Sequence, residues 1–211
     1  MTPPDANLTV AEAGYLLDQS SKSLNRAIDR GVIEARISGV GKSRQRVIGR
    51  AELRFLKVTS FLDRDLTPTG RKRIYRAIKH LAGDAHRLQL GGLILEFEPV
   101  DRELSERFAR LAALKSGVDA GADREPVLKG TDIPVYAVAA LAKSSAAGEI
   151  GEDYPGLTSD QIDTASDYAK AYPKAGRPYP ARSFKRMIGD LAAGGVFDAE
   201  PDDPASLAMF K

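Results

Sequence analysis

The chain has 211 residues, of which 43% are hydrophobic and 28% charged, and its formal net charge is +2. This composition excludes a largely disordered chain, and the lack of cysteine excludes a disulfide scaffold, a cysteine zinc site and a thiol nucleophile. No apolar stretch approaches the roughly 20 residues of a membrane span. The first residues also lack a basic start followed by an apolar run, so we expect a cytoplasmic protein that does not enter a membrane.

The charge is unevenly divided along the chain. Residues 1–90 hold 17 Lys and Arg against 9 Asp and Glu, whereas residues 91–211 hold 14 against 20. This polarity indicates a basic half that meets nucleic acid and an acidic half with a different task.

Two short helices are predicted at the start of the basic half. Thr9 and Glu12 form a capping box that begins the first helix at Val10. Ser20 or Ser21 caps the second helix, over Lys22–Arg30, and Gly31 ends it in a left-handed conformation.

A hairpin and a third helix follow. Alternation around Gly39–Gly41 predicts a two-stranded wing over Glu34–Ser38 and Lys42–Ile48, and a helix runs from Ala51 towards Leu62. The order helix, helix, hairpin, helix resembles the winged helix-turn-helix domains of MerR and excisionase proteins. The resemblance implies DNA binding.

Basic and polar residues of the second helix and the wing are the candidate DNA contacts. Nine Lys and Arg against three Asp and Glu lie between Ser20 and Arg54, and Arg50 and Arg54 are phosphate candidates with the rest. At the start of a recognition helix, an Asn side chain can form two hydrogen bonds with adenine, and an Arg side chain can form two with guanine. An ordinary solvated surface is the alternative. The predicted contacts are Ser20, Ser21, Lys22, Asn25, Arg26, Arg30, Arg36, Lys42, Arg44 and Arg46.

The middle of the chain reads as connecting helices and strands. Thr67 caps a helix that continues to Leu81, strands flank Gly91-Gly92 within Leu88–Pro99, and Asp101 caps a further helix through Leu114. The first of these helices carries the basic residues Arg71, Lys72, Arg73, Arg76 and Lys79, which either extend the phosphate footprint or solvate a helix surface.

Three other patterns do not indicate catalysis. Gly39–Ser43 lacks the first glycine of a phosphate-binding loop and precedes a strand instead of a helix. His80 and His86 are six residues apart, with no further His or Cys to complete a metal site. Acid pairs such as Glu96 and Glu98 lack a neighbouring base or nucleophile. We therefore expect no enzyme activity, no metal and no cofactor, with an enzyme of unrecognised type as a further hypothesis.

The acidic half carries a specific motif. It resembles the small bacterial family called domain of unknown function 433 over Leu114–Pro173. The matching residues are Pro126-Val127, Lys129-Gly130-Thr131, Ile133-Pro134-Val135, Tyr154-Pro155, Leu157-Thr158 and the helix to Tyr168-Ala169. Longer members, with a helix-turn-helix in front, resemble VapB-type antitoxins, which neutralise PIN-domain ribonucleases.

The helix pair around Tyr154-Pro155 is itself helix-turn-helix-like but acidic. Residues 147–172 hold six Asp and Glu against one Lys, so phosphate would be repelled there. This surface serves dimerisation or a basic partner, or is merely solvated. With the strand segment Leu88–Phe97, it is a candidate dimer surface.

The last 36 residues are predicted to wrap a partner or to fold back on the body. Ser183 would cap an amphipathic helix that Gly194-Gly195 ends, and apolar residues continue to Phe210. The predicted toxin contacts are Arg182, Phe184, Arg186, Met187, Leu191 and Phe197.

The sequence thus predicts a mainly α protein with small β hairpins in four segments. These are a winged helix-turn-helix domain (1–64), connecting helices and strands (65–113), a family 433-like helical domain (114–175) and a partner-binding tail (176–211). The predicted function is a homodimeric type II antitoxin that binds operator DNA and a PIN-domain toxin. The alternative is a stand-alone transcriptional regulator or excisionase-like factor without a toxin.

Overall fold

A computed structural model describes residues 7–41, 44–62, 66–122, 125–145, 147–180 and 184–194. Over these residues the chain is mainly helical with small antiparallel sheets, which confirms the predicted class. The helices are α1 (Val10–Leu17), α2 (Ser21–Asp29), α3 (Arg50–Phe61), α4 (Pro68–Lys79), α5 (Glu98–Ser116), α6 (Val135–Leu141), α7 (Ala147–Asp153), α8 (Ser159–Ala171) and α9 (Phe184–Ala193). The strands are β1 (Leu8–Thr9), β2 (Arg36–Ser38), β3 (Gln45–Ile48), β4 (Arg87–Leu90), β5 (Leu93–Glu96), β6 (Val118–Ala120) and β7 (Pro126–Leu128).

Local capping signals set the starts of α1 and α2. The Thr9 hydroxyl accepts the Glu12 N–H at 3.2 Å, and the Glu12 carboxylate accepts the Thr9 N–H at 2.9 Å, so the predicted capping box is confirmed. Ser20 caps α2 by accepting the Ser23 N–H at 3.1 Å. Gly31 follows with a φ of 66°, the left-handed conformation that favours glycine.

The predicted wing is an antiparallel pair, β2 with β3. Arg36 lies opposite Val47 and Ser38 opposite Gln45. Strand β1 joins the other edge of β3, with Leu8 opposite Ile48, giving the order β1-β3-β2. This third strand was not predicted, because two residues are too few to show an alternating pattern.

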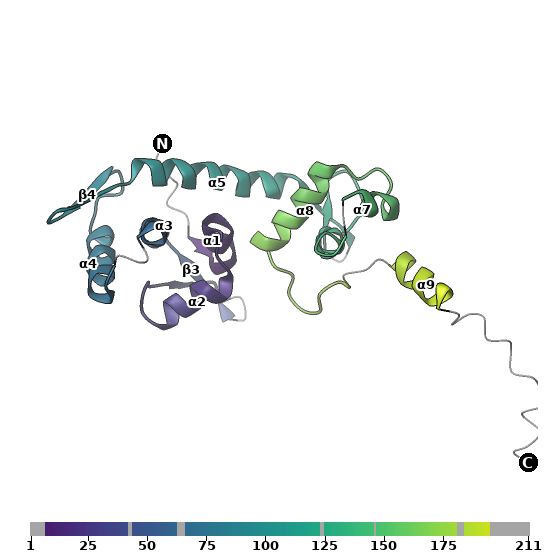
Figure 1. Cartoon of the computed structure of the whole chain (residues 1–211), viewed down its shortest axis with the longest axis horizontal. Helices are drawn as coiled ribbons and strands as arrows, with labels where there is room; N and C mark the ends of the chain where they lie inside the picture. Colours follow the sequence, from purple (N-terminus) through teal and green to yellow (C-terminus); the bar gives the residue numbers. More distant parts are fainter. Residues whose placement is uncertain are drawn as a thin grey trace, which may run out of the picture.

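The long helix α5 spans the molecule. Figure 1 shows it running along one side, from the β4–β5 hairpin over α3 and α1 to the helices of the acidic half. Its predicted start at Asp101 was wrong, since α5 begins at Glu98 with Pro99 in its first turn, where proline is well tolerated. Asp101 lies inside the helix and is buried.

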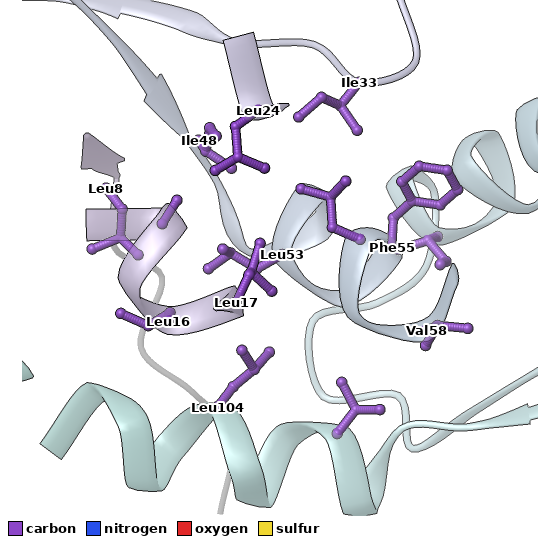
Figure 2. Packing of buried hydrophobic residues seen from close by; sticks show 14 of the residues in the cluster. Leu8, Leu16, Leu17, Leu24, Ile33, Ile48, Leu53, Phe55, Val58 and Leu104 are labelled. Carbon is purple, nitrogen blue, oxygen red and sulfur yellow. The ribbon is translucent and has the colours of Figure 1, made fainter. Parts of the chain in front are cut away.

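The larger of two apolar clusters lies beneath α5. Figure 2 shows Leu104 of α5 pointing towards Leu17 of α1 and Leu53 of α3. The same cluster takes in Ile74 of α4 and Leu88 of β4, so residues of the predicted first and second segments share one core. The predicted segment boundaries themselves stay a prediction.

The smaller cluster holds the acidic half together. It joins β7 to α6, α7 and α8, with Leu128, Val135 and Ile150 almost fully buried. Tyr168 of α8 packs against both clusters, and α8 also contacts α1 and α5. Helix α8 therefore joins the smaller cluster to the larger one, and α5 also packs against α1 and α3.

None of the helices that the structure describes is long and apolar enough to cross a membrane.

Candidate nucleic-acid interface

Helix α2 presents its cations on a single side. Leu24 is fully buried against the core, and this fixes which side of the helix faces inward. Lys22, Arg26 and Arg30 are spaced four residues apart, so they share the opposite side, and all three are exposed. Two of these cations lie on the nine-residue helix and Arg30 follows at its C-cap, and together they form a row suited to contact nucleic-acid phosphates.

A polar contact between β3 and α2 fixes the wing against this helix. One Nη of Arg46 donates to Asn25 Oδ1 at 3.0 Å and lies 2.8 Å from Asp29 Oδ1. Asn25 in turn donates from Nδ2 to the Ser21 carbonyl at 2.9 Å. Both ends of the Asn25 amide are thus engaged within the protein, and a base edge would have to compete for them.

The turn end of the wing is exposed, whereas Val47 and Ile48 of β3 are buried. Arg36 and Arg44 face solvent, and Val40 is 89% exposed at the turn between the strands. Gly39 and Gly41, with φ angles of 90° and 59°, allow this tight turn. Strand β3 follows where a phosphate-binding loop would need a helix, so rejecting that motif is confirmed. Lys42 lies outside the described residues.

Two arginines of the basic run point into the protein. Arg54 is only 3% exposed and donates from Nε to Asp101 at 2.7 Å, with a second bond from Nη to the same carboxylate. Arg50 is half-buried beside the same carboxylate at 3.7 Å. The expectation that Arg54 neutralises phosphate was wrong. Nothing in the local sequence gave a signal for its partner, which lies 47 residues away.

The predicted site residues that the structure describes therefore have different surroundings. Ser20 and Asn25 hold α2 and the wing in place, Arg46 bridges the two elements, and Ser21 is half-buried. The exposed cations left for phosphate are Lys22, Arg26, Arg30, Arg36 and Arg44.

The end of α8 lies beside this surface. A groove of about 560 Å³ is lined by Ser21, Asn25 and Arg46 on one side and by Tyr172 and Pro173 on the other. Burial raises the pKa of the Tyr172 phenol, so this tyrosine is neutral at ordinary pH. The acidic half thus borders the residues predicted to read bases.

A second groove, of about 600 Å³, separates the α1–α2 turn from α5 and α8. Arg107 bridges its walls, since it pairs with Asp18 at 2.6 Å and donates to the Leu16 carbonyl at 3.1 Å. The hydrogen bond from Arg107 lowers the pKa of Asp18. Across the groove, Tyr15 donates to Asp167 of α8 at 3.3 Å, and burial, then Asp167, raise the pKa of Tyr15. These contacts join the two halves.

The residues after α8 are fastened to the acidic half at Glu125. Lys174 donates to one oxygen of this carboxylate at 2.9 Å, and Tyr179 donates to the other at 2.8 Å. Hydrogen bonds from Lys174 and then Tyr179 lower the pKa of Glu125. We call residues 173–180 the strap. Both oxygens of the Glu125 carboxylate thus hold the strap.

Helix α9 stands apart from the body in Figure 1. Met187, Ile188 and Leu191 share one side of it and are 43%, 41% and 42% exposed, although they are apolar. Phe184 and Arg186 lie in its first turn. Arg182 and Phe197 lie outside the described residues.

The predicted dimer surface over Leu88–Phe97 is partly used within the chain. Leu88, Leu95 and Phe97 are buried in the larger cluster, so they are not available to a second copy. Ile94 is the exposed large apolar side chain of the hairpin. His80 and His86 are exposed, and within the described ranges no group of three or more His, Asp or Glu is placed to hold a metal ion.

Comparisons with known proteins support one part of the sequence reading. A family model described as a protein of unknown function, DUF433, matches residues 122–169, which confirms the resemblance found in the acidic half. The chain is 29% identical over 207 residues to the uncharacterized protein y4eO of Sinorhizobium fredii, and the match covers 90% of this chain and 89% of that relative. No solved structure matches the chain significantly.

Proposed function

We propose that this chain is a type II antitoxin of the VapB kind, which binds operator DNA through its basic half and a PIN-domain ribonuclease through its tail. The observation that carries the DNA-binding part is the pairing of α2 with the wing. Arg46 fastens β3 to α2 through Asn25 and Asp29, and exposed cations lie on or next to α2, β2 and β3. We interpret residues 8–62 as a winged helix-turn-helix with α2 as the recognition helix.

The charge of each element supports this division of labour. Lys22, Arg26 and Arg30 would neutralise phosphates and release counterions. The acidic α7 and α8, which would be repelled by phosphate, belong to the part of the chain that matches DUF433. We therefore assign DNA to the basic half alone.

The DNA-binding part is tested with exposed residues of α2. The probe is duplex DNA from upstream of the chain's own gene, and binding is followed by fluorescence anisotropy. Arg26→Ala should weaken binding by about 1–3 kcal/mol if Arg26 contacts a base. Lys143→Ala removes an exposed cation from the acidic half and should leave affinity unchanged. Equal affinity of both variants and the unaltered chain would remove α2 from the interface.

The toxin-binding part is supported by the apolar side of α9. Met187, Ile188 and Leu191 are exposed together on a helix that lies away from both apolar clusters. Covering such a side releases roughly 25 cal/mol per Å² of apolar area, before the cost of ordering the tail. A PIN toxin has clustered carboxylates, with which the tail cations Arg182 and Arg186 would form charge-assisted hydrogen bonds.

Full-length variants test this part. Met187→Asp with Leu191→Asp should abolish protection of cells that express the PIN-domain ribonuclease encoded beside the gene, because two charges would face the partner. Gly189→Ala leaves the apolar side intact and should protect fully. Truncation after Pro180 should likewise abolish protection but leave operator binding nearly unchanged. Protection by the Asp variant would place the toxin surface elsewhere, with the α7–α8 pair as the next candidate.

The alternative is a stand-alone regulator, which shares the DNA-binding surface and lacks a toxin partner. A gene neighbourhood without a PIN-domain reading frame, together with repression of the upstream promoter, would favour it.

A further inference from the structure

Helix α4 carries a basic surface that the proposed recognition helix does not include. Ile74, Tyr75 and Ile78 of α4 are buried against the core. The other side of the helix presents exposed cations, and α4 contains no acidic residue. We define the α4 surface by Lys72, Arg73, Arg76 and Lys79.

The pattern of these charges is costly for a helix that only meets water. Lys72 and Arg76 are four residues apart, and Arg76 and Lys79 are three apart, so like charges are neighbours along the surface. Like-charge pairs at these spacings destabilise a helix, whereas solvated helices usually alternate the two signs. An anionic partner would remove this repulsion.

A pocket is lined by three of the four cations that define the α4 surface. It has a volume of about 340 Å³, and its lining includes Lys72, Arg76, Lys79 and His80. Glu34 is the acid that lines it, and Lys79 pairs with Glu34 at 2.5 Å. Within the described part of the chain, neither Lys72 nor Arg76 forms an ion pair, so both cations are open to an external anion.

The pocket adjoins the C-terminal end of α2. Gly31 and Glu34, in the loop that leaves α2, form part of its wall. The Glu34 N–H donates to the Tyr75 hydroxyl at 2.9 Å, and that hydroxyl donates to Glu52 of α3 at 2.8 Å. The loop is thus fixed against α4, and the cation row that ends at Arg30 meets the α4 surface at Gly31.

We propose that the α4 surface binds the phosphate backbone of the same DNA duplex that α2 reads, with Lys72 and Arg76 each neutralising one phosphate. This inference rests on the proposed DNA binding and specifies a second contact region for it. Phosphate contacts of this kind position a protein on DNA without reading its sequence. The α4 surface should therefore add to the salt dependence of binding without contributing to sequence preference, which we assign to α2.

The test compares two charge-matched double variants of the full-length chain. Lys72→Ala with Arg76→Ala removes two cations of the pocket, and Arg102→Ala with Lys143→Ala removes two exposed cations from α5 and the acidic half. Affinity for the upstream duplex and for a scrambled duplex is measured from about 50 to about 200 mM salt. Thermal unfolding of each variant checks that the fold is kept.

Loss of two phosphate contacts should reduce the slope of log affinity against log salt by about 1.8. Over this salt range the unaltered chain should lose roughly tenfold more affinity than the α4 variant. The α4 variant should weaken binding to both duplexes alike, and the control variant should match the unaltered chain.

Two results would overturn the inference, and they have different consequences for the proposed function. Equal slopes for the two double variants, with Arg26→Ala still weakening binding, would remove α4 from the footprint and keep the proposed function. If the unaltered chain binds neither duplex, both the inference about α4 and the proposed DNA binding are wrong.

Discussion

Arg54 of α3 and Asp101 of α5 form a buried, two-bonded ion pair between the helix that follows the wing and the long helix that spans the molecule. Their side chains are 4% and 6% exposed, and the Arg54 guanidinium lies 5.0 Å from the centre of the Phe97 ring. A buried pair of this kind fixes the relative position of two helices more than it adds net stability.

Removing one partner of this pair should destabilise the chain strongly. Asp101→Asn leaves the Arg54 charge buried without a counter-charge, and we expect a loss of about 3–5 kcal/mol in the free energy of unfolding. Urea denaturation measures it. Asp132→Asn, at an exposed position, should change the free energy little. A loss below about 1 kcal/mol for Asp101→Asn would show that water reaches Arg54.

The turn between α1 and α2 should not tolerate a side chain at Gly14. A Cβ there would lie 2.6 Å from the Gln19 carbonyl oxygen, a backbone atom that cannot rotate away. Gly14→Ala should cost about 1–3 kcal/mol and weaken DNA binding, because α2 would move relative to α1. Gly148→Ala in α7 meets nothing within 4 Å and should be neutral or stabilising. Thermal unfolding and anisotropy together check both variants.

The strap should depend on pH through Glu125. The pKa of Glu125 is lowered in the fold, so its contribution is present above the ordinary value of 4.5 and disappears as pH falls through the folded value. The pKa of Tyr179 is raised, chiefly by its hydrogen bond to Glu125, so its contribution is present below 10.0 and disappears as pH rises through the folded value. Protection from hydrogen exchange over residues 173–180, measured relative to the intrinsic exchange rate at each pH, should accordingly be greatest between these limits.

Glu125→Gln tests the same attachment at neutral pH. The variant should lower protection in the strap to a level that no longer falls on acidification, whereas Glu106→Gln, at an exposed position of α5, should leave the protection profile unchanged. A strap that exchanges equally slowly in both variants would have to be held by other contacts.

The chain should be a dimer in solution at micromolar concentration, because operators read by such domains are usually inverted repeats. Two dimer surfaces were predicted, the strand segment Leu88–Phe97 and the acidic α7–α8 surface. Since Leu88, Leu95 and Phe97 are buried within the chain, the α7–α8 surface is the candidate that remains. Repulsion between two acidic surfaces is screened by salt, so light scattering should show the dimer strengthening as salt rises. A monomer at every salt concentration would contradict this prediction.

Elements with local start and stop signals were predictable from the sequence. Thr158 and Gln161 have the spacing of a capping box and begin α8, and Thr67 with Pro68 begins α4. Contacts between residues far apart in sequence were not predictable. Tyr15 and Asp167, which form a hydrogen bond, are 152 residues apart in the sequence. The two-residue strand β1 is recognised as a strand because it pairs with β3. Asp101 shows the limit best, because an acid near a helix start also fits a cap, and only the fold shows that Arg54 faces it.

The same limit applies to the candidate site. The exposure of Lys22, Arg26 and Arg30 follows from helical spacing around Leu24, and the structure places them as that spacing implies. The engagement of Asn25 by Arg46 depends on how the wing folds back, for which single-sequence patterns give no signal.

The most direct test of the account is the preference of the unaltered chain for its own upstream DNA over a scrambled duplex of equal length and composition, measured by anisotropy at about 0.15 M salt. A specific operator-binding protein should bind its site at least about 10³-fold more tightly than unrelated sequence. The account predicts a preference of that order, reduced by Arg26→Ala. Equal affinity for the two duplexes, or no binding to either, would contradict it.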